Sequence, residues 1–95
     1  MKRNIGMHTS AESARKNILA YLLRVAPNYS HRGALKSQLG FAAFPDYDFK
    51  APQGAAFSVA KIVRKMEDDQ LIAQKFSEFD RGFYLTAAGR LEAAA

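Results

Sequence analysis

The sequence has no cysteine, only two histidines and only three prolines among its 95 residues. The absence of cysteine excludes disulfides, thiolate metal sites and cysteine nucleophiles. No apolar run approaches the roughly 18 to 20 residues that a bilayer span needs, and the N-terminal sequence MKRNIGMH lacks the apolar segment of a signal peptide. We therefore expect a cytoplasmic protein that makes no contact with a membrane.

Patterns that carry catalysis are also missing. The glycines are scattered and form no phosphate-binding motif. His8 and His31 lie in segments without the apolar surroundings of an active-site pocket. Asp46 and Asp48 are one residue apart, but no third oxygen ligand stands nearby for a metal ion. We expect no enzymatic activity, no cofactor and no metal site.

The composition is that of a small globular domain with a basic surface. Hydrophobic residues make up 48% of the chain and charged residues 24%, which suits one domain with one small core. The net charge is +5, and the first 40 residues hold seven of the 14 basic residues with Glu12 as their only acid. Such asymmetry favours a polyanionic partner, and the alternative is a basic surface that serves solubility alone.

The chain opens with residues 1–8, which we predict to be a flexible basic arm before a single domain of residues 9–95. The sequence from Thr9 to Glu12 fits a capping box for a helix that runs from Ser10 to Ala26. Helical spacing gathers one apolar face, which consists of Ala14, Ile18, Tyr21, Leu22 and Val25. Leu19 and Leu23 lie outside that face, where they either widen the core or form a dimer contact.

A second helix is predicted from His31 to Leu39, with Ser30 as its cap and Gly40 as its end. Arg32 and Lys36 are four residues apart and would share one face, where they can hold backbone phosphates. We interpret this helix as the first of a helix-turn-helix.

An aromatic segment follows between Gly40 and Gln53. Its rings either fold over the core or form a patch for a protein partner, and they are Phe41, Phe44, Tyr47 and Phe49. We favour the core, most of all for Phe41, because it comes directly after the predicted end of the helix.

The third predicted helix, Ala55 to Asp69, divides into two faces. The apolar residues Ala56, Val59, Ile62, Val63 and Met66 should pack inward. The opposite arc has the donors and positive charge that a major-groove recognition helix needs, from Ser58, Lys61, Arg64, Lys65 and Asp68. Phe57 lies at the edge of this arc, where it contacts either the aromatic segment or a thymine methyl group, and we favour the aromatic segment.

The C-terminal third reads as a β-hairpin between two helices. Residues 71–76 are strand-like, residues 77–82 form a polar turn, and residues 83–86 return as a second strand. Thr86 then occupies the N-cap position of a short C-terminal helix.

These residues resemble the winged helix-turn-helix family, in particular its MarR-like and PadR-like branches. The matching elements are Leu71-Ile72 after the third helix, Asp80-Arg81 at the wing tip and the run LTAAGR from Leu85 to Arg90. Gln70 stands where the family often has a glycine. The resemblance implies an α+β winged helix-turn-helix fold, with three helices, a two-stranded β-wing and a short C-terminal helix.

On this basis we expect a sequence-specific protein that binds double-stranded DNA, most simply a transcriptional regulator that pairs as a homodimer. In the predicted interface Ser58, Lys61 and Lys65 contact bases or groove edges, Gln53 and Gly54 offer donors at the helix start, and phosphates are held by Arg32, Lys36 and Arg64. Lys75 and Arg81 on the wing reach the backbone or minor groove. The alternative is a protein-interaction module that uses the aromatic residues 41–49.

Overall fold

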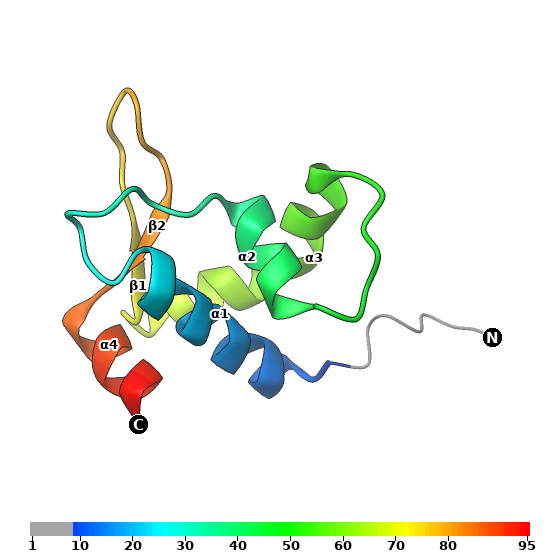
Figure 1. Cartoon of the computed structure of the whole chain (residues 1–95), viewed down its shortest axis with the longest axis horizontal. Coiled ribbons are helices and arrows are strands. Elements are labelled where there is room, and N and C mark those ends of the chain that lie inside the picture. Colours follow the sequence, from blue (N-terminus) through cyan, green and yellow to red (C-terminus); the bar gives the residue numbers. More distant parts are fainter. Residues whose placement is uncertain (1–8) are drawn as a thin grey trace.

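The computed structural model of the chain describes residues 9–95, so the predicted arm of residues 1–8 lies outside the described residues. The described part is α+β, with four helices and a two-stranded antiparallel sheet (Figure 1). The elements follow the order α1 (Ala11–Val25), α2 (Lys36–Ala43), α3 (Pro52–Asp68), β1 (Ile72–Gln74), β2 (Phe83–Leu85) and α4 (Ala87–Ala94).

The core lies where α2 packs on both α1 and α3 and where the sheet covers the end of α1. Each large apolar side chain that leaves water there contributes about 1.5 to 3 kcal/mol to folding. The largest of the fully buried side chains are Phe83, Ile18, Leu22, Leu39, Met66, Ile72, Leu85, Val59 and Val63. Leu19 is only 3% exposed and belongs to this core, so its predicted alternative role in a dimer contact is wrong, whereas Leu23 is 39% exposed.

Helix α1 begins one residue later than predicted. Ser10 is extended and its side-chain oxygen accepts from the backbone N–H of Ser13 at 3.0 Å, so Ser10 is the N-cap. The predicted capping box of Thr9 and Glu12 is therefore wrong, because Glu12 falls at the second helical position rather than the third.

The predicted helix from His31 to Leu39 is confirmed only for residues 36–39. Residues 31–35 lie before α2, and Ala34 forms an antiparallel bridge to Phe83 through two backbone hydrogen bonds of 2.9 and 2.7 Å. Gly40 lies inside α2 instead of ending a helix. A Cβ atom there would come within 2.2 Å of the Ala55 carbonyl oxygen, so glycine is what lets α2 approach α3.

Because α2 runs on to Ala43, past the predicted end at Leu39, the environment of the aromatic segment differs from the expected one. Phe44 and Phe49 are buried, at 4% and 9% exposure, and Phe49 lies at the centre of the cluster with its ring 5.5 Å from Phe41 and 4.6 Å from Tyr47. Phe41 is 45% exposed because residue 41 still belongs to the helix and falls on its outer side. The prediction of a core role for Phe41 is therefore wrong, and the same prediction for Phe44 and Phe49 is confirmed.

Helix α3 begins three residues before the predicted start, because Pro52 suits the first helical position. It ends at a Schellman motif in which the N–H of Gln70 donates to Glu67 and the N–H of Leu71 donates to Met66, at 2.9 and 3.0 Å. Gln70 has a φ of 62°, the left-handed conformation that a glycine adopts without strain. The polar residue at the place of the expected glycine thus still ends the helix.

Thr86 joins this helix end to α4. Its hydroxyl donates to the Gln70 carbonyl at 2.6 Å and accepts from the Gly89 N–H at 3.0 Å, which confirms the predicted N-cap. Gly89 packs so closely that a Cβ atom there would lie 2.0 Å from the Leu71 carbonyl oxygen.

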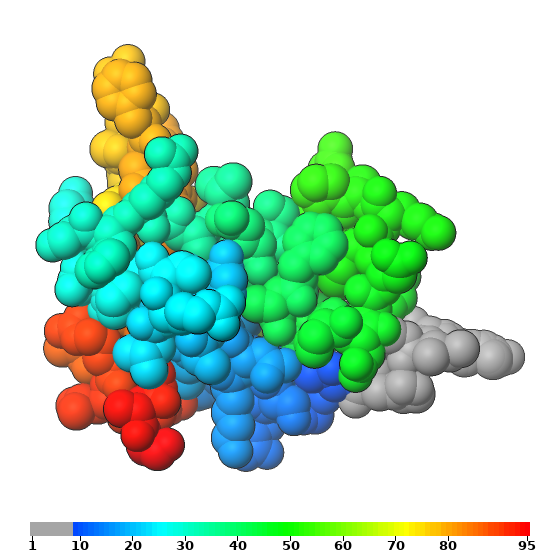
Figure 2. All heavy atoms as spheres, in the orientation of Figure 1, coloured from blue at the N-terminus to red at the C-terminus, as the bar shows by residue number. Residues whose placement is uncertain are grey.

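The β-hairpin is shorter in paired strand than predicted, but it projects well beyond the body of the molecule (Figures 1 and 2). The register pairs Ile72 with Leu85, Ala73 with Tyr84 and Gln74 with Phe83. One further hydrogen bond of 2.9 Å, from the Lys75 N–H to the Gly82 carbonyl, closes the ladder. We call residues 76–81 beyond this bond the hairpin tip.

Candidate nucleic-acid interface

The outer face of α3 has the polar character that the sequence predicts. Ala55, Val59, Val63 and Met66 are buried, whereas Phe57, Lys61, Arg64 and Lys65 on the other side are exposed and Ser58 is half-buried. Phe57 is 85% exposed, so its predicted contact with the aromatic segment is wrong. The helix therefore presents two lysines, an arginine and a phenylalanine ring to solvent.

Lys36 extends this positive surface from the start of α2. It lines a shallow hollow together with Lys61 and Arg64 of α3. In the part of the chain that the structure describes, none of these three side chains forms an ion pair. Glu67 also lines this hollow, so three cations lie there beside one carboxylate, and the net positive charge attracts an anion such as a phosphate group.

Lys65 differs from its neighbours because it pairs with Asp69, with 3.1 Å between Nζ and Oδ1. Asp69 also accepts from Arg15 of α1 at 3.0 Å. The hydrogen bonds from Lys65 and then Arg15 lower the pKa of Asp69 below its ordinary value, so it is ionised near neutrality. Part of the charge of Lys65 is therefore offset within the molecule.

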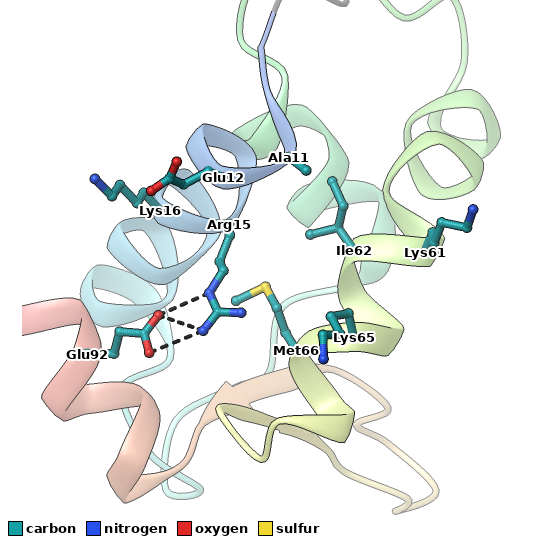
Figure 3. A pocket seen from close by; sticks show the side chains of 9 residues that line it. All are labelled: Ala11, Glu12, Arg15, Lys16, Lys61, Ile62, Lys65, Met66 and Glu92. Atoms are coloured by element: carbon teal, nitrogen blue, oxygen red, sulfur yellow. Dashed lines mark hydrogen bonds and ion pairs between the residues drawn. The ribbon is translucent and has the colours of Figure 1, made fainter.

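A groove runs along the flank of α3 that faces α1 (Figure 3). Ala11, Ile62 and Met66 supply its apolar surface. Its charged lining consists of Glu12, Arg15, Lys16, Lys61, Lys65 and Glu92. Arg15 holds Glu92 through two hydrogen bonds of 3.0 and 3.2 Å and so ties α1 to α4 at one end of the groove. Four cations and two carboxylates line this groove, whereas three cations and one carboxylate line the hollow beside Lys36.

The start of α3 offers fewer donors than predicted. Gln53 and Gly54 are both exposed, but the Gly54 N–H donates to the Ala51 carbonyl at 3.0 Å. The predicted role of Gly54 as a backbone donor to a ligand is therefore wrong, while Gln53 still projects at the exposed end of the helix.

Lys75 is the largest departure from the predicted interface. Its side chain is only 9% exposed, and its ammonium group donates to the His31 carbonyl at 2.6 Å and pairs with Asp80 at 3.3 Å. It also lies 4.6 Å from the centre of the Tyr29 ring. These contacts hold the hairpin to the segment before α2, so the predicted contact of Lys75 with DNA is wrong.

Asp80 completes this anchor. Its carboxylate accepts from the backbone N–H groups of Gly33 and Gly82 at 3.0 and 2.9 Å. These two hydrogen bonds, with a smaller contribution from Lys75, lower the pKa of Asp80 to about 2. The acidic residue of the Asp80-Arg81 pair therefore points back to the body of the protein, and Arg81 is the exposed member.

Arg32 lies near the hairpin tip rather than on a helix face with Lys36. It lines a hollow with Phe79 and Arg81. The predicted pair of Arg32 and Lys36 on one helix is wrong, because residues 31–35 precede α2. The exposed cations of the predicted interface that are free of ion pairs within residues 9–95 thus form two groups, one with Lys36, Lys61 and Arg64 and the other with Arg32 and Arg81.

Sequence reasoning missed the two phenylalanines of the hairpin tip, Phe76 and Phe79, which are 75% and 83% exposed. The signal was present in the run FSEF, since a turn of residues 77–80 removes Phe79 from any core. The strand pattern instead suggested that Phe76 would continue the paired strand.

Within residues 9–95 no helix is long and apolar enough to span a bilayer, and no group of three or more histidine and acidic side chains is close enough to hold a metal ion. Searches of protein-family models, curated proteins and solved structures find no match to this chain.

Proposed function

We propose that this chain is a winged helix-turn-helix protein that binds double-stranded DNA, with α3 in the major groove. The observation that carries the proposal is the positive surface of Lys36, Lys61 and Arg64 on α2 and α3, which forms no ion pair among the described residues and outweighs the one carboxylate of the same hollow, Glu67. A major groove about 12 Å wide admits one α-helix, and basic side chains on the outer face can then reach both phosphates and base edges.

The order of the elements supports the same proposal. A bridge at Ala34 stands between α1 and α2, α3 follows after residues 44–51, and the hairpin of β1 and β2 comes next. In a winged helix-turn-helix this order sets the second and third helices against each other and the wing beside them. The contacts of α2 with α3, made close by Gly40, fit that arrangement.

The DNA contacts that we propose for individual residues differ from those predicted from the sequence. Lys61 and Arg64 are central on α3, with Ser58 and the partly neutralised Lys65 at its edge. Lys36 would hold a phosphate beside them. Arg81 and Arg32 would contact the backbone or minor groove next to the hairpin. Regulation of transcription would follow from where such a protein binds on the genome.

The test is binding of a short duplex at several salt concentrations, followed by selection of preferred sequences. If about four to six phosphates are contacted, log K should fall against log salt with a slope of about −0.9 per contact. Lys61→Ala and Arg64→Ala should each weaken binding, and Arg64→Ala should reduce the slope by about one contact. Arg24→Ala is the control, because it removes the same charge from α1, where the guanidinium lies 5.4 Å from the Tyr21 ring centre.

Binding that hardly changes with salt would contradict the proposal. Equal losses in the α3 variants and the Arg24 control would show that only net charge matters and would remove α3 from the interface.

We further propose that two copies pair on DNA, because one domain of this size offers few base contacts. Because Leu19 is buried in the core, the surface that joins the two copies consists of the exposed Leu23 or of the outer rings of the aromatic cluster. Sedimentation of the complex measures this directly. A monomer that forms a one-to-one complex on the selected duplex would rule out the dimer.

A second candidate function is a protein-interaction module. The observation that favours it is the half-exposed pair Phe41 and Tyr47, at 45% and 38%, around the buried Phe49. Phe41 also lines a shallow groove with Tyr21 and Pro45 between α1 and α2. Phe41→Ser should abolish capture of a partner and leave duplex binding unchanged if this surface has that role.

A further inference from the structure

The hairpin tip is unusual for a surface that meets only phosphates, because its exposed residues are more aromatic than basic. Phe76 and Phe79 are 75% and 83% exposed, and the tip stands clear of the body of the molecule (Figure 2). Two large apolar side chains held in water are unfavourable for the isolated protein, and they indicate a contact that covers them.

The tip is also held in shape by its own hydrogen bonds. The Ser77 hydroxyl donates to the Asp80 carbonyl at 3.0 Å and accepts from the Asp80 N–H at 2.8 Å. The Ser77 N–H donates to the same carbonyl at 3.2 Å. Glu78 and Phe79 therefore occupy the two central positions of a closed turn, and Phe79 projects from the point of it.

The base of the tip is anchored to the rest of the chain. Asp80 is bonded to Gly33 and Gly82, and Lys75 is bonded to the His31 carbonyl and paired with Asp80. A side chain on an anchored hairpin loses little conformational entropy when it binds, so the free energy of its contact is not offset by ordering of the loop.

Positive charge lies immediately behind the aromatic rings. The Arg81 guanidinium is 6.0 Å from the centre of the Phe76 ring, and Arg32 and Phe79 line the same hollow. Architectural proteins that bind the minor groove combine arginines, drawn by its negative potential, with an apolar wedge that enters between two base pairs. The hairpin tip has both parts.

We propose that Phe79 is such a wedge, an inference that rests on the DNA-binding function proposed above. The hairpin tip enters the minor groove, and Phe79 partly unstacks one base step. The duplex then bends away from the protein. Phe76 and Arg81 support the wedge from behind and contact the groove wall. The preferred step is a flexible pyrimidine–purine step such as TA, because it unstacks at the lowest cost. Specificity at that step then comes from deformability rather than from base-edge hydrogen bonds.

Glu78 opposes this contact, whereas the other acidic residue of the tip, Asp80, is paired with Lys75. The Glu78 carboxylate adjoins Phe79 in the turn and would be repelled by the phosphates on either side of the groove. The proposal therefore makes a second expectation: Glu78→Gln should tighten duplex binding several-fold and preserve the bend, and the gain should shrink as salt is raised.

The experiment measures bending and binding on the same samples of the full chain. A duplex selected for binding carries a donor and an acceptor dye at its ends, so that a bend raises energy transfer, and the central step is either TA or a stiff step. Wild-type protein should bend the TA duplex. Phe79→Ala should abolish the bend while weakening binding less than about tenfold, because the cost of unstacking the two base pairs offsets most of the favourable energy of inserting the ring. Phe79→Leu should restore part of the bend.

Leu91→Ala is the matched control, since Leu91 is similarly exposed at 77% but lies on α4, outside the proposed DNA contacts. It should leave the bend intact. A wild-type protein that binds the duplex without bending it, or a Phe79→Ala variant that bends it fully, would overturn the wedge and leave the proposed function standing. Loss of self-association in Phe79→Ala with an unchanged bend would assign the tip to a second copy instead. Failure to bind any duplex would overturn the proposed function and the wedge together.

Discussion

Gly33 and Gly82 lie back to back, so that a Cβ atom on Gly33 would come within 2.4 Å of the Gly82 carbonyl carbon and one on Gly82 within 2.1 Å of the Gly33 carbonyl carbon. The contact joins the segment before α2 to the hairpin next to the Ala34 bridge, although the two residues are far apart in the sequence. The base of the hairpin therefore depends on two positions that have no side chain.

Substitution of either glycine should consequently destabilise the fold. Gly82→Ala forces two backbones apart, and overpacking of this kind costs about 1 to 3 kcal/mol of unfolding free energy. Gly54→Ala is the control, because the nearest atom to its new Cβ, Cδ1 of Phe49, is at an ordinary distance of 3.7 Å. That variant should be neutral or more stable by up to about 1 kcal/mol. Chemical denaturation of both variants checks the difference, and equal stability would refute the close contact.

Gln70 holds the left-handed conformation that ends α3, with a φ of 62°. A side chain costs roughly 1 kcal/mol there, and glycine avoids most of that cost but loses more entropy on folding. Gln70→Gly should therefore raise the unfolding free energy by a few tenths to about 1 kcal/mol, whereas Gln70→Ala should not. Thermal melts of the two variants measure the effect. An alanine variant that is as stable as the glycine variant would contradict the strain.

The pKa of Asp80, lowered from 3.8 to about 2, makes stability depend on pH in the acid range. A carboxyl group with a lowered pKa in the folded state stabilises the fold fully above its unfolded pKa and loses that contribution as pH falls towards the folded value. The free energy of unfolding should thus decrease between about pH 4 and pH 2. Asp80→Asn should flatten this part of the curve.

Asp69 serves as the comparison for the acid titration, because its pKa is also lowered, by Lys65 and Arg15. Asp69→Asn should remove its own share of the pH dependence and leave that of Asp80. If Asp80→Asn has the same acid profile as the unsubstituted chain, the bonds to Gly33 and Gly82 do not stabilise the carboxylate.

Lys75 and Arg81 should separate stability from binding. Lys75→Met removes the partner of Asp80 and leaves the His31 carbonyl without its donor, so it should lower the melting temperature. Arg81→Ala changes an exposed side chain and should leave the melting temperature within about 2 °C while weakening duplex binding. If Lys75→Met has the melting temperature of the unsubstituted chain but binds duplex poorly, Lys75 contacts DNA and does not anchor the hairpin.

The aromatic cluster supplies a further contrast in stability. Phe44 is 4% exposed, and Phe44→Ala should cost about 3 to 5 kcal/mol, enough to unfold a small domain. Phe41→Ala should cost clearly less, because 45% of that residue is exposed and its main aromatic contact is the edge of Phe49. Circular dichroism during urea titration distinguishes the two, and equal costs would show that Phe41 is buried in solution.

The sequence by itself determined the features that depend on neighbours along the chain. Hydrophobic spacing sets the inner and outer faces of α3, because side chains three and four residues apart share one side of a helix. The hydroxyl of Thr86 caps α4 from the adjacent turn, and the polar turn after the first strand makes the hairpin. The same local information marked Lys61 and Arg64 as exposed cations.

The tertiary structure alone decided the features that depend on residues far apart in the sequence. Gly40 reads as a helix end until α3 is packed against it, and Lys75 reads as a DNA contact until His31 and Asp80 enclose it. Phe41 lies at the surface because the close approach of α2 and α3 lets that helix continue past Gly40. The backbone groups in these contacts find their partners in a distant segment of the chain. Composition and periodicity within one segment therefore do not predict them.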